Sequence, residues 1–408
     1  MPRFRCRLIK NIFAAIMALV LLACAVEVGL RYYDNKTGWV SEETASQLPY
    51  LAASSERYCR LQSMKTFQVK HPDSGKITEL KTNSFGLRGN EIQVPKPTGL
   101  LRIICLGDER VLAAETPEKE TFSYQLQQLL QSRTQLRVEV INAGVPHSCP
   151  LLSCLHLRQS LLGLQPDLVI LNFDMSDIAD DHRLRRHLIT DANDIPLACA
   201  HPTLQKKDQQ CELHHRSPFL LLDWGKNQIK SMKNSSGETR DLQDIDSPQG
   251  EYAWIRDDPP DWSIYIKQAL RPIGQIQTMT EGSYARMLVG VIPTPWQVSA
   301  KACQNKMISA QNGIELGRYY RSRVPFETIA NYTDQKRILF CDSSPYFLQR
   351  QNPEQLFLKN KIRLSPTGHE LYARVLASFV IAKIPGPWLS ESEMKRPKKM
   401  ASQPRQQQ

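Results

Sequence analysis

The most informative stretch of this chain is Leu101-Arg102-Ile103-Ile104-Cys105-Leu106-Gly107-Asp108-Glu109. Its first six residues are almost wholly apolar, which is typical of a parallel strand buried on both faces. Gly107 and Asp108 then predict a tight turn, because both residue types favour turns. A helix is expected to begin after this turn, so the stretch indicates the strand, turn and helix of an α/β sheet.

Predicted strands and helices alternate after this stretch. The strands expected from apolar runs are Leu101–Leu106, Val138–Asn142, Asp167–Phe173, Arg286–Ile292 and Ile338–Phe340. The helices expected from apolar periodicity are Phe122–Ser132, Leu151–Leu164, Ser263–Met279 and Glu370–Ile381. This alternation argues for a doubly wound α/β domain with a parallel sheet.

Four short blocks lie in order along these elements. They are Leu106-Gly107-Asp108-Glu109, Val140-Ile141-Asn142-Ala143-Gly144-Val145, Asp174-Met175-Ser176-Asp177 and the segment from Asn360 to His369. Together they resemble the SGNH, or GDSL-type, ester hydrolases over roughly residues 83–384. The resemblance implies a three-layer α/β/α sandwich with a parallel, flavodoxin-like sheet. It also implies activity on esters of lipids, acylated sugars or acetylated polysaccharides.

The catalytic positions of that family fall on five residues of this chain. Glu109 stands where the family has its nucleophilic serine, and Arg363 stands where it has its general-base histidine. Asn360 replaces the catalytic aspartate, and Ser176 replaces the oxyanion asparagine. Gly144 matches the glycine whose backbone N–H helps to form the oxyanion hole. The resemblance therefore names a site in which four of five residues are substituted.

These substitutions remove the chemistry of the family mechanism. A serine attacks only when a base takes its proton, and Arg363 stays protonated at any relevant pH. Asn360 cannot supply the charge that stabilises an imidazolium. We therefore expect a non-catalytic protein that binds a carbohydrate or acyl-ester ligand, or that scaffolds an envelope assembly. The alternative is an active ester hydrolase or O-acyltransferase that uses a non-standard set of residues.

The paired replacement of serine and histidine suggests a more specific contact. In the family fold these two side chains face each other, so Glu109 and Arg363 are expected to form a charge-assisted salt bridge across the former active site. A helix N-terminus beside Glu109 would favour its carboxylate. The alternative is that both are solvated surface charges.

Other ionisable residues near these blocks have simpler interpretations. His369 is expected to pack at the start of the last helix, and His147 to lie in a surface loop. The acidic run Asp174, Asp177, Asp180 and Asp181 could hold a hard cation, but capping of a helix is the favoured interpretation. No cofactor and no metal site is expected.

The net charge of +11 raises the question of nucleic-acid binding. Much of this charge lies in the two termini, and the body has no basic stripe interleaved with aromatic residues. We therefore expect no nucleic-acid partner.

The N-terminus carries an export pattern. Four basic residues precede the apolar run Ile12–Val26, and Tyr32-Tyr33 follow it as candidate interfacial residues. We expect an uncleaved signal anchor and transmembrane helix over residues 11–31, which places the main domain on the extracytoplasmic side. The segment Leu21–Cys24 also resembles a lipobox, so lipidation of Cys24 is the alternative.

Five segments follow from these patterns. They are a basic N-terminus at 1–10, the anchor at 11–31, a linker with a hairpin over Thr66–Thr82 at 32–82, the SGNH hydrolase-like domain at 83–386, and a disordered basic tail at 387–408. Within the domain, an insertion at about 187–262 breaks the α/β rhythm.

Ten cysteines leave the redox state open. An exported domain permits disulfides, and the two candidate pairs are Cys199 with Cys211 and Cys303 with Cys341. Buried free thiols are the alternative, above all for Cys105 within its apolar strand.

Overall fold

The computed structural model describes residues 48–192, 195–205 and 250–389, together with Met17, residues 23–27 and Gly29. The chain divides into two units, one of residues 1–44 and 206–247 and the other of residues 45–205 and 248–408. Most of the expected signal anchor at 11–31, the core of the insertion at 206–249 and the tail from 390 onward lie outside the described residues. Within the described part of the chain, no helix has the length and apolar character needed to cross a membrane.

A five-stranded parallel sheet forms the centre of the larger unit. Its strands are β5 (Leu100–Gly107), β6 (Arg137–Gly144), β7 (Leu168–Phe173), β10 (Arg286–Val291) and β11 (Leu339–Asp342). Their order in space is β11-β10-β7-β5-β6. The first strand of this sheet, β5, thus lies between the second, β6, and the third, β7, which is the flavodoxin-like order. All five predicted strands are confirmed, with ends displaced by three residues or fewer.

The two faces of the sheet carry separate cores. On β5, Ile103 and Cys105 belong to one core, whereas Ile104 and Leu106 belong to the other. This alternation follows from the two-residue period of a strand, and burial on both faces explains its continuous apolar run. The expected three-layer α/β architecture therefore holds.

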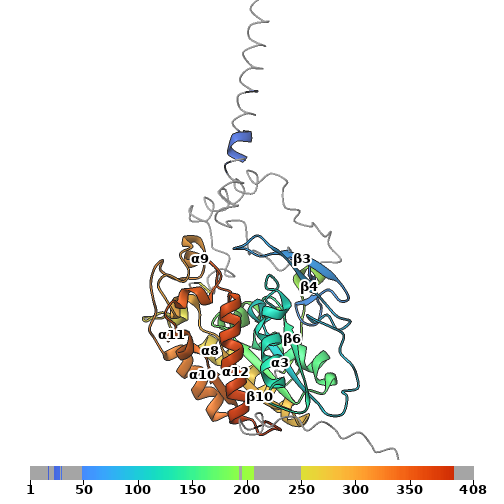
Figure 1. The fold of residues 1–408 in the computed structure, drawn as a ribbon. Helices are drawn as coiled ribbons and strands as arrows, with labels where there is room; N and C mark the ends of the chain where they lie inside the picture. The colour runs from blue at the N-terminus through green and yellow to red at the C-terminus, as the bar shows by residue number, and fades with distance from the viewer. Residues whose placement is uncertain are drawn as a thin grey trace, which may run out of the picture. The chain divides into compact units, whose positions relative to one another are not determined.

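Helices cover both faces of the sheet (Figure 1). Helices α3 (Phe122–Gln131) and α12 (Pro366–Lys383) pack in the core of Ile103, and α4 (Pro150–His156) and α8 (Ser263–Gly282) pack in the core of Ile104. The shorter or peripheral helices are α2 (Glu109–Leu112), α5 (Asp177–Arg185), α6 (Pro202–Gln205), α9 (Lys306–Gln311), α10 (Val324–Gln335) and α11 (Ser344–Leu348).

The predicted helices are present, and three of them differ in extent. Helix α8 ends at Gly282, three residues later than expected. The helix expected over Leu151–Leu164 is α-helical only through His156 and then continues as a π-turn and a 3-10 turn. Helix α12 begins at Pro366, earlier than expected, because Ser365 caps it by accepting the Gly368 N–H.

The expected connector before the domain proved to be partly structured. Within 32–82, strands β1 (Leu51–Ala53) and β2 (Cys59–Leu61) pair antiparallel, and Tyr50 and Leu61 are buried. The linker predicted at 32–82 therefore contains a second antiparallel pair of strands before its hairpin. The following hairpin is confirmed as β3 (Thr66–Lys70) and β4 (Ile77–Lys81).

Both described ends of the insertion are also structured. Strands β8 (Leu188–Thr190) and β9 (Pro196–Cys199) pair antiparallel, and Trp254 and Trp262 are buried in the core. Past residue 386, the Leu389 N–H donates to the Arg133 carbonyl at 2.7 Å. Contacts with the domain therefore reach at least residue 389, three residues beyond the expected boundary at 386.

The candidate disulfide between Cys303 and Cys341 was wrong, since both residues are buried and Cys341 is a free thiol. Cys199 is free and Cys211 lies outside the described residues. Burial raises the pKa of the Cys105 thiol, as expected for a cysteine packed as a small apolar side chain.

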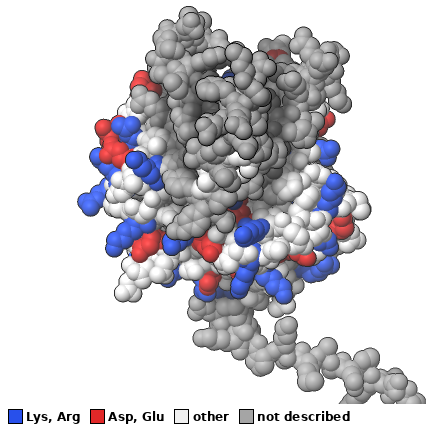
Figure 2. Space-filling view, turned by 90° about the horizontal axis from the view of Figure 1, so that it is seen from above, with Lys and Arg blue, Asp and Glu red and all other residues white. Residues whose placement is uncertain are grey.

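Charges on the described surface are mixed. Figure 2 shows basic and acidic side chains interspersed over the described part of one face. On that face, the charges of the body do not gather into a basic stripe.

Candidate functional site

The turns that follow three parallel strands meet at one edge of the sheet. Gly107 at the end of β5 pairs with Gly144 at the end of β6, and Leu106 pairs with Leu171 near the end of β7. From β5, the next strand along the chain, β6, is added on one side, and the later strands β7, β10 and β11 are added on the other side. The point between β5 and β7 is therefore the topological switch point, where doubly wound sheets bind ligands. The candidate site is therefore the edge that holds Glu109 and the segment after β7.

A glycine with an unusual backbone starts the turn after β5. Gly107 has φ +151°, and a Cβ atom there would lie 2.4 Å from Val111 Cγ2. Asp108 caps the following helix α2 by accepting the Arg110 N–H at 2.9 Å. The Gly-Asp pair thus shapes the turn and delivers Glu109 as the first residue of α2.

Glu109 is half-buried and held as an anion. Burial alone would raise its pKa, but the electrostatic influence of His147 and Arg363 and hydrogen bonds from backbone N–H groups outweigh burial and lower the pKa. One of these groups is the His147 N–H, which donates to Glu109 Oε2 at 3.3 Å. The turn after β5 therefore presents a carboxylate and no hydroxyl at position 109.

Arg363 pairs with a different carboxylate from the one expected. Its Nη1 lies 3.0 Å from Oε1 of Glu115, a buried residue that sequence reasoning did not select. The positive charge of Arg363 lowers the pKa of the Glu109 carboxyl. The predicted direct bridge between Glu109 and Arg363 is corrected to an Arg363–Glu115 pair, because the chain after α2 places a second carboxylate within reach.

Tyr50 lies close enough to Arg363, Glu115 and Glu109 for their charges to act on its hydroxyl. Sequence reasoning did not select this residue. Burial raises the pKa of its hydroxyl to about 12, and the charges of Arg363, Glu115 and Glu109 also act on it. The residue precedes β1, in the segment at 32–82 that was expected to be a linker. An isolated aromatic residue followed by the apolar Leu51 was the available signal for its burial.

Gly144 is retained, but its backbone N–H is already engaged. It donates to Asn142 Oδ1 at 3.1 Å. A Cβ atom at Gly144 would lie 2.2 Å from the backbone nitrogen of Leu112, so α2 packs directly against the end of β6. The fold therefore needs this glycine whether or not it stabilises an oxyanion.

Ser176 and the acidic run have internal partners. The Ser176 N–H donates to Asp174 Oδ1 at 2.9 Å, and its side chain hydrogen-bonds to Asp180. Asp177 accepts the Asp174 N–H at 3.1 Å and, with Asp180, lies in the first turn of α5. These two acids lie where the helix dipole favours a negative charge, but no side chain caps the N-terminus of α5 by a hydrogen bond, so that part of the capping interpretation was wrong. Among the described residues, no cluster of histidine, cysteine, aspartate or glutamate could hold a metal ion.

Asn360 stabilises the loop before α12. Its φ of +56° is one that asparagine tolerates better than most residues, and its Oδ1 accepts the Gln304 N–H at 3.1 Å. This residue therefore ties the loop before α12 to the loop before α9. It carries no charge that could orient a histidine.

His369 packs inside the domain, as expected. It is buried, stacks on Phe122 with the ring centroids 6.1 Å apart, and burial lowers its pKa to about 3. A neutral histidine enclosed in this way is a packing residue of α12. The backbone of His147, by contrast, contacts Glu109 directly.

A buried ion pair crosses the switch point itself. Arg110 Nε lies 2.5 Å from Asp174 Oδ2, and both side chains are 3% exposed or less. Asp174 also accepts the Tyr252 hydroxyl at 3.2 Å. Sequence reasoning noted Asp174 in the acidic run and overlooked Arg110. The available signal was that Asp174 directly follows β7 and that Arg110 lies three residues after the end of β5, the neighbouring strand.

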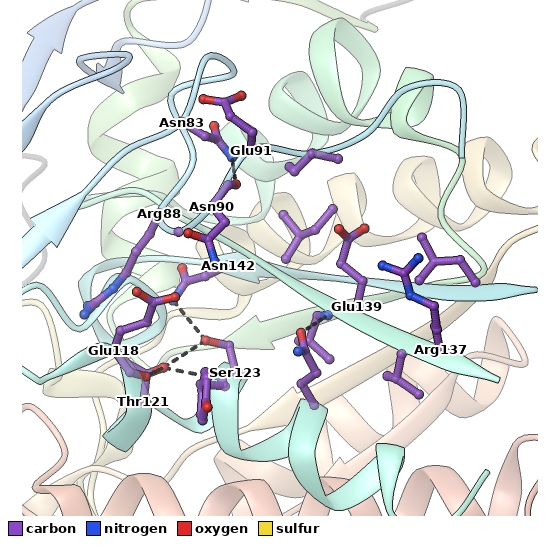
Figure 3. Close-up of a pocket in the computed structure, with 18 residues that line it drawn as sticks. Asn83, Arg88, Asn90, Glu91, Glu118, Thr121, Ser123, Arg137, Glu139 and Asn142 are labelled. Atoms are coloured by element: carbon purple, nitrogen blue, oxygen red, sulfur yellow. Dashed lines mark hydrogen bonds between the residues drawn. The ribbon is translucent and has the colours of Figure 1, made fainter. Parts of the chain in front are cut away.

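A cavity of about 220 Å³ lies away from these residues, along edge strand β6 (Figure 3). None of the five predicted site positions lines it. The structure thus brings Glu109, Arg363 and the turn residues Gly144 and Ser176 to one edge of the sheet, while this cavity opens elsewhere.

Comparison with known proteins gives matches in structure alone. No family model matches the chain, and no curated protein matches its sequence. Similar solved structures include an acetylxylan esterase from Geobacillus stearothermophilus, with 11% identity, a TM-score of 0.36 and coverage of 69% of this chain and 94% of that chain.

Two further similar structures carry lipase-type descriptions. A putative lipolytic protein of the G-D-S-L family from Desulfitobacterium hafniense has 13% identity, a TM-score of 0.35 and coverage of 68% of this chain and 98% of its own. A GDSL-like lipase from Bacteroides thetaiotaomicron has 8% identity, a TM-score of 0.36 and coverage of 70% and 90%, respectively. The function must be argued from the residues of this chain.

Proposed function

We propose that this chain is an SGNH hydrolase-like protein whose former active site no longer hydrolyses esters by the family mechanism. The observation that carries the proposal is the state of Glu109. Its carboxylate is held ionised by His147, Arg363 and backbone N–H groups at the position of the nucleophile. A serine mechanism needs a hydroxyl and an unprotonated base, and neither is present at positions 109 and 363.

The surrounding contacts support a structural use of the same positions. Arg363 pairs with Glu115, Asn360 holds a loop, and the Gly144 N–H binds Asn142. Each group that would act on an ester in the family mechanism is thus committed to a partner within the chain. We infer a role in binding a carbohydrate or acyl-ester ligand, or in scaffolding an envelope assembly, with the protein anchored through residues 11–31.

The test of the proposal is an esterase assay on the full chain. Hydrolysis of p-nitrophenyl acetate would be compared between the native protein and the variant Glu109→Ser/Arg363→His/Asn360→Asp, which rebuilds the family residues. The native chain should give no turnover above background. A matched control, Glu120→Ser, changes an exposed glutamate outside the site.

Strong native turnover would overturn the proposal if it survives Glu109→Ala and is lost on substitution of another residue at the same edge of the sheet. That result would support an active esterase or acyltransferase with a non-standard residue set. Anchoring would be tested separately, by asking whether deletion of residues 11–31 moves the protein from the membrane fraction to the soluble fraction.

A further inference from the structure

The central sheet has two edge strands, β6 and β11. An edge strand exposes a row of backbone N–H and C=O groups that can pair with another chain. Strand β11 has only four residues, so its row is short, whereas β6 has eight. A bridge between Arg88 and Asn142 occupies the outer side of β6 near its C-terminal end. Among the described residues, no strand pairs with the outer side of its N-terminal half.

Two glutamines of α3 occupy the place that another strand would take. The N–H groups of Val138 and Val140, here called the edge amides, point away from β5. They donate to Oε1 of Gln131 and to Oε1 of Gln127, respectively, each at 2.9 Å. Side chains of the chain's own helix therefore satisfy the edge amides.

The carboxamide of Gln131 binds β6 as a strand residue would. Besides accepting from the Val138 N–H, it donates from Nε2 to the carbonyl of Leu136 at 2.8 Å. In a parallel pair, one residue of a strand likewise bonds to a carbonyl of its neighbour and to the N–H two residues further along. This one side chain thus makes both hydrogen bonds that a residue of an added parallel strand would make.

The spacing of the two glutamines matches the spacing of the edge amides. Gln127 and Gln131 are four residues apart, which is about 6 Å along a helix. The edge amides are two residues apart, which is about 6.6 Å along a strand. Helix α3 lies beside β6 (Figure 1), and its buried leucines pack in the same core as Val138. One turn of the helix therefore fits two alternate residues of the strand, so both edge amides are bound at once.

We infer that Gln127 and Gln131 close this edge of the sheet against a second copy of the chain. Two copies can bring β6 together antiparallel about a two-fold axis, since each presents the same row of groups. Centred on Val138, this pairing places Arg137 of one copy opposite Glu139 of the other, and opposite charges in such a position attract. The glutamines oppose the pairing, because the N–H groups that the second strand needs are already bound.

This inference goes beyond the proposed function. The edge amides lie toward the start of β6, whereas Gly144 ends that strand and Glu109 follows the end of β5. Self-association and ester hydrolysis are therefore measured independently, and either expectation can fail without the other.

The test is sedimentation velocity of the full chain over a wide range of concentration, for the native protein and for Gln127→Met/Gln131→Met. Methionine has nearly the length of glutamine but lacks its carboxamide. This variant should self-associate at least about tenfold more tightly than the native chain, because its edge amides are left to pair with another strand. The matched control is Gln128→Met/Gln349→Met, which adds the same side chains at two exposed positions.

The control should sediment as the native chain does, and circular dichroism should show that both variants are folded. The inference is overturned if the native chain and Gln127→Met/Gln131→Met sediment alike at every concentration. It is also overturned if the control associates as tightly as that variant, since added apolar surface would then explain the association.

Hydrogen exchange resolved to single amides by mass spectrometry tests the same contacts in the native chain itself. In dilute solution both edge amides should be protected from exchange. They should exchange about fivefold faster or more in Gln127→Met/Gln131→Met, as the loss of one hydrogen bond implies. Gln127→Glu/Gln131→Glu keeps an acceptor oxygen at each position and should preserve the protection. Unprotected edge amides in the native chain would overturn the inference whatever the variants show.

Discussion

Arg110 and Asp174 join the turns that follow β5 and β7, with Nε 2.5 Å from Oδ2 in a buried ion pair. The two strands are neighbours in the sheet but their turns are far apart in the chain. The pair crosses the switch point at which doubly wound folds bind their ligands. Two charges in this position stabilise each other, and each would be left uncompensated if the other were removed.

The first prediction concerns the stability that depends on this pair. Arg110→Met should lower the free energy of unfolding by about 3–5 kcal/mol, because it leaves the Asp174 carboxylate buried without its partner. Urea denaturation followed by circular dichroism measures the change. Adding Asp174→Leu to the first substitution should recover part of the loss.

The exposed pair of Arg374 and Glu370 on α12 provides the control. Arg374→Met should cost less than about 1 kcal/mol, since exposed pairs contribute little. Equal losses for Arg110→Met and Arg374→Met would contradict the importance of the buried pair.

The second prediction concerns the glycine at the end of β6. Gly144→Ala should unfold the domain or destabilise it severely, because the new Cβ would lie 2.2 Å from the Leu112 nitrogen, which is backbone and cannot move alone. Gly163→Ala is the control, since no atom lies within 4 Å of its Cβ position. Thermal unfolding of both variants checks this expectation. A Gly144→Ala protein as stable as Gly163→Ala would show that α2 does not pack on this residue.

The third prediction is a dependence of stability on pH. Burial raises the pKa of Asp180 to about 7, with Arg183 opposing the shift; burial and the Asp180 charge raise the pKa of Glu251 to about 7. Between their ordinary values near 4 and this raised value, the folded state binds more protons than the unfolded state. The stability that Asp180 and Glu251 contribute is therefore fully present below about pH 4 and is lost as the pH rises through about 7.

The melting temperature should consequently fall between pH 5 and pH 8 as these two groups ionise, by an amount that the double variant Asp180→Asn/Glu251→Gln reduces. The contribution of Glu109 to stability depends on pH in the opposite direction. Its lowered pKa contributes stability above its ordinary value that is lost at more acidic pH. A native curve with the same slope as that of the double variant would refute the assignment of the two raised pKa values.

The fourth prediction concerns the thiols. Alkylation of the denatured, unreduced protein should modify both Cys303 and Cys341, because neither is in a disulfide. In the native protein both should react slowly, since they are buried and burial raises the pKa of Cys341 to about 12. Peptide mapping by mass spectrometry reads out both states. Recovery of a Cys303–Cys341 cross-linked peptide would reject this expectation.

The sheet could be predicted from the sequence because its evidence is local. Continuous apolar runs in β5, β7 and β10 follow from burial on two faces, and glycines mark where β5 and β6 end. The short strands β1 and β2 carry no such run. Residues like Tyr50 become buried only because another part of the fold covers them. The sequence therefore predicted only a linker around them, within residues 32–82.

The candidate site was predicted only as far as residue type allows. An arginine at position 363 excludes a general base whatever surrounds it, and an asparagine at 360 excludes a charged orienting acid. The partner of Arg363 could not be deduced in this way. Glu109 and Glu115 carry the same group six positions apart, and only the path of the chain after α2 decides which of them the guanidinium meets.

The sequence by itself determined the alternation of strands and helices and the absence of a serine at position 109 and of a histidine at position 363, because periodicity and side-chain chemistry belong to individual residues. The tertiary structure decided the Arg110–Asp174 pair, the engagement of the Gly144 N–H, and the cavity beside β6. Each of these depends on the positions of residues that are distant in the chain. Long-range packing sets those positions, and no local pattern of residues encodes them.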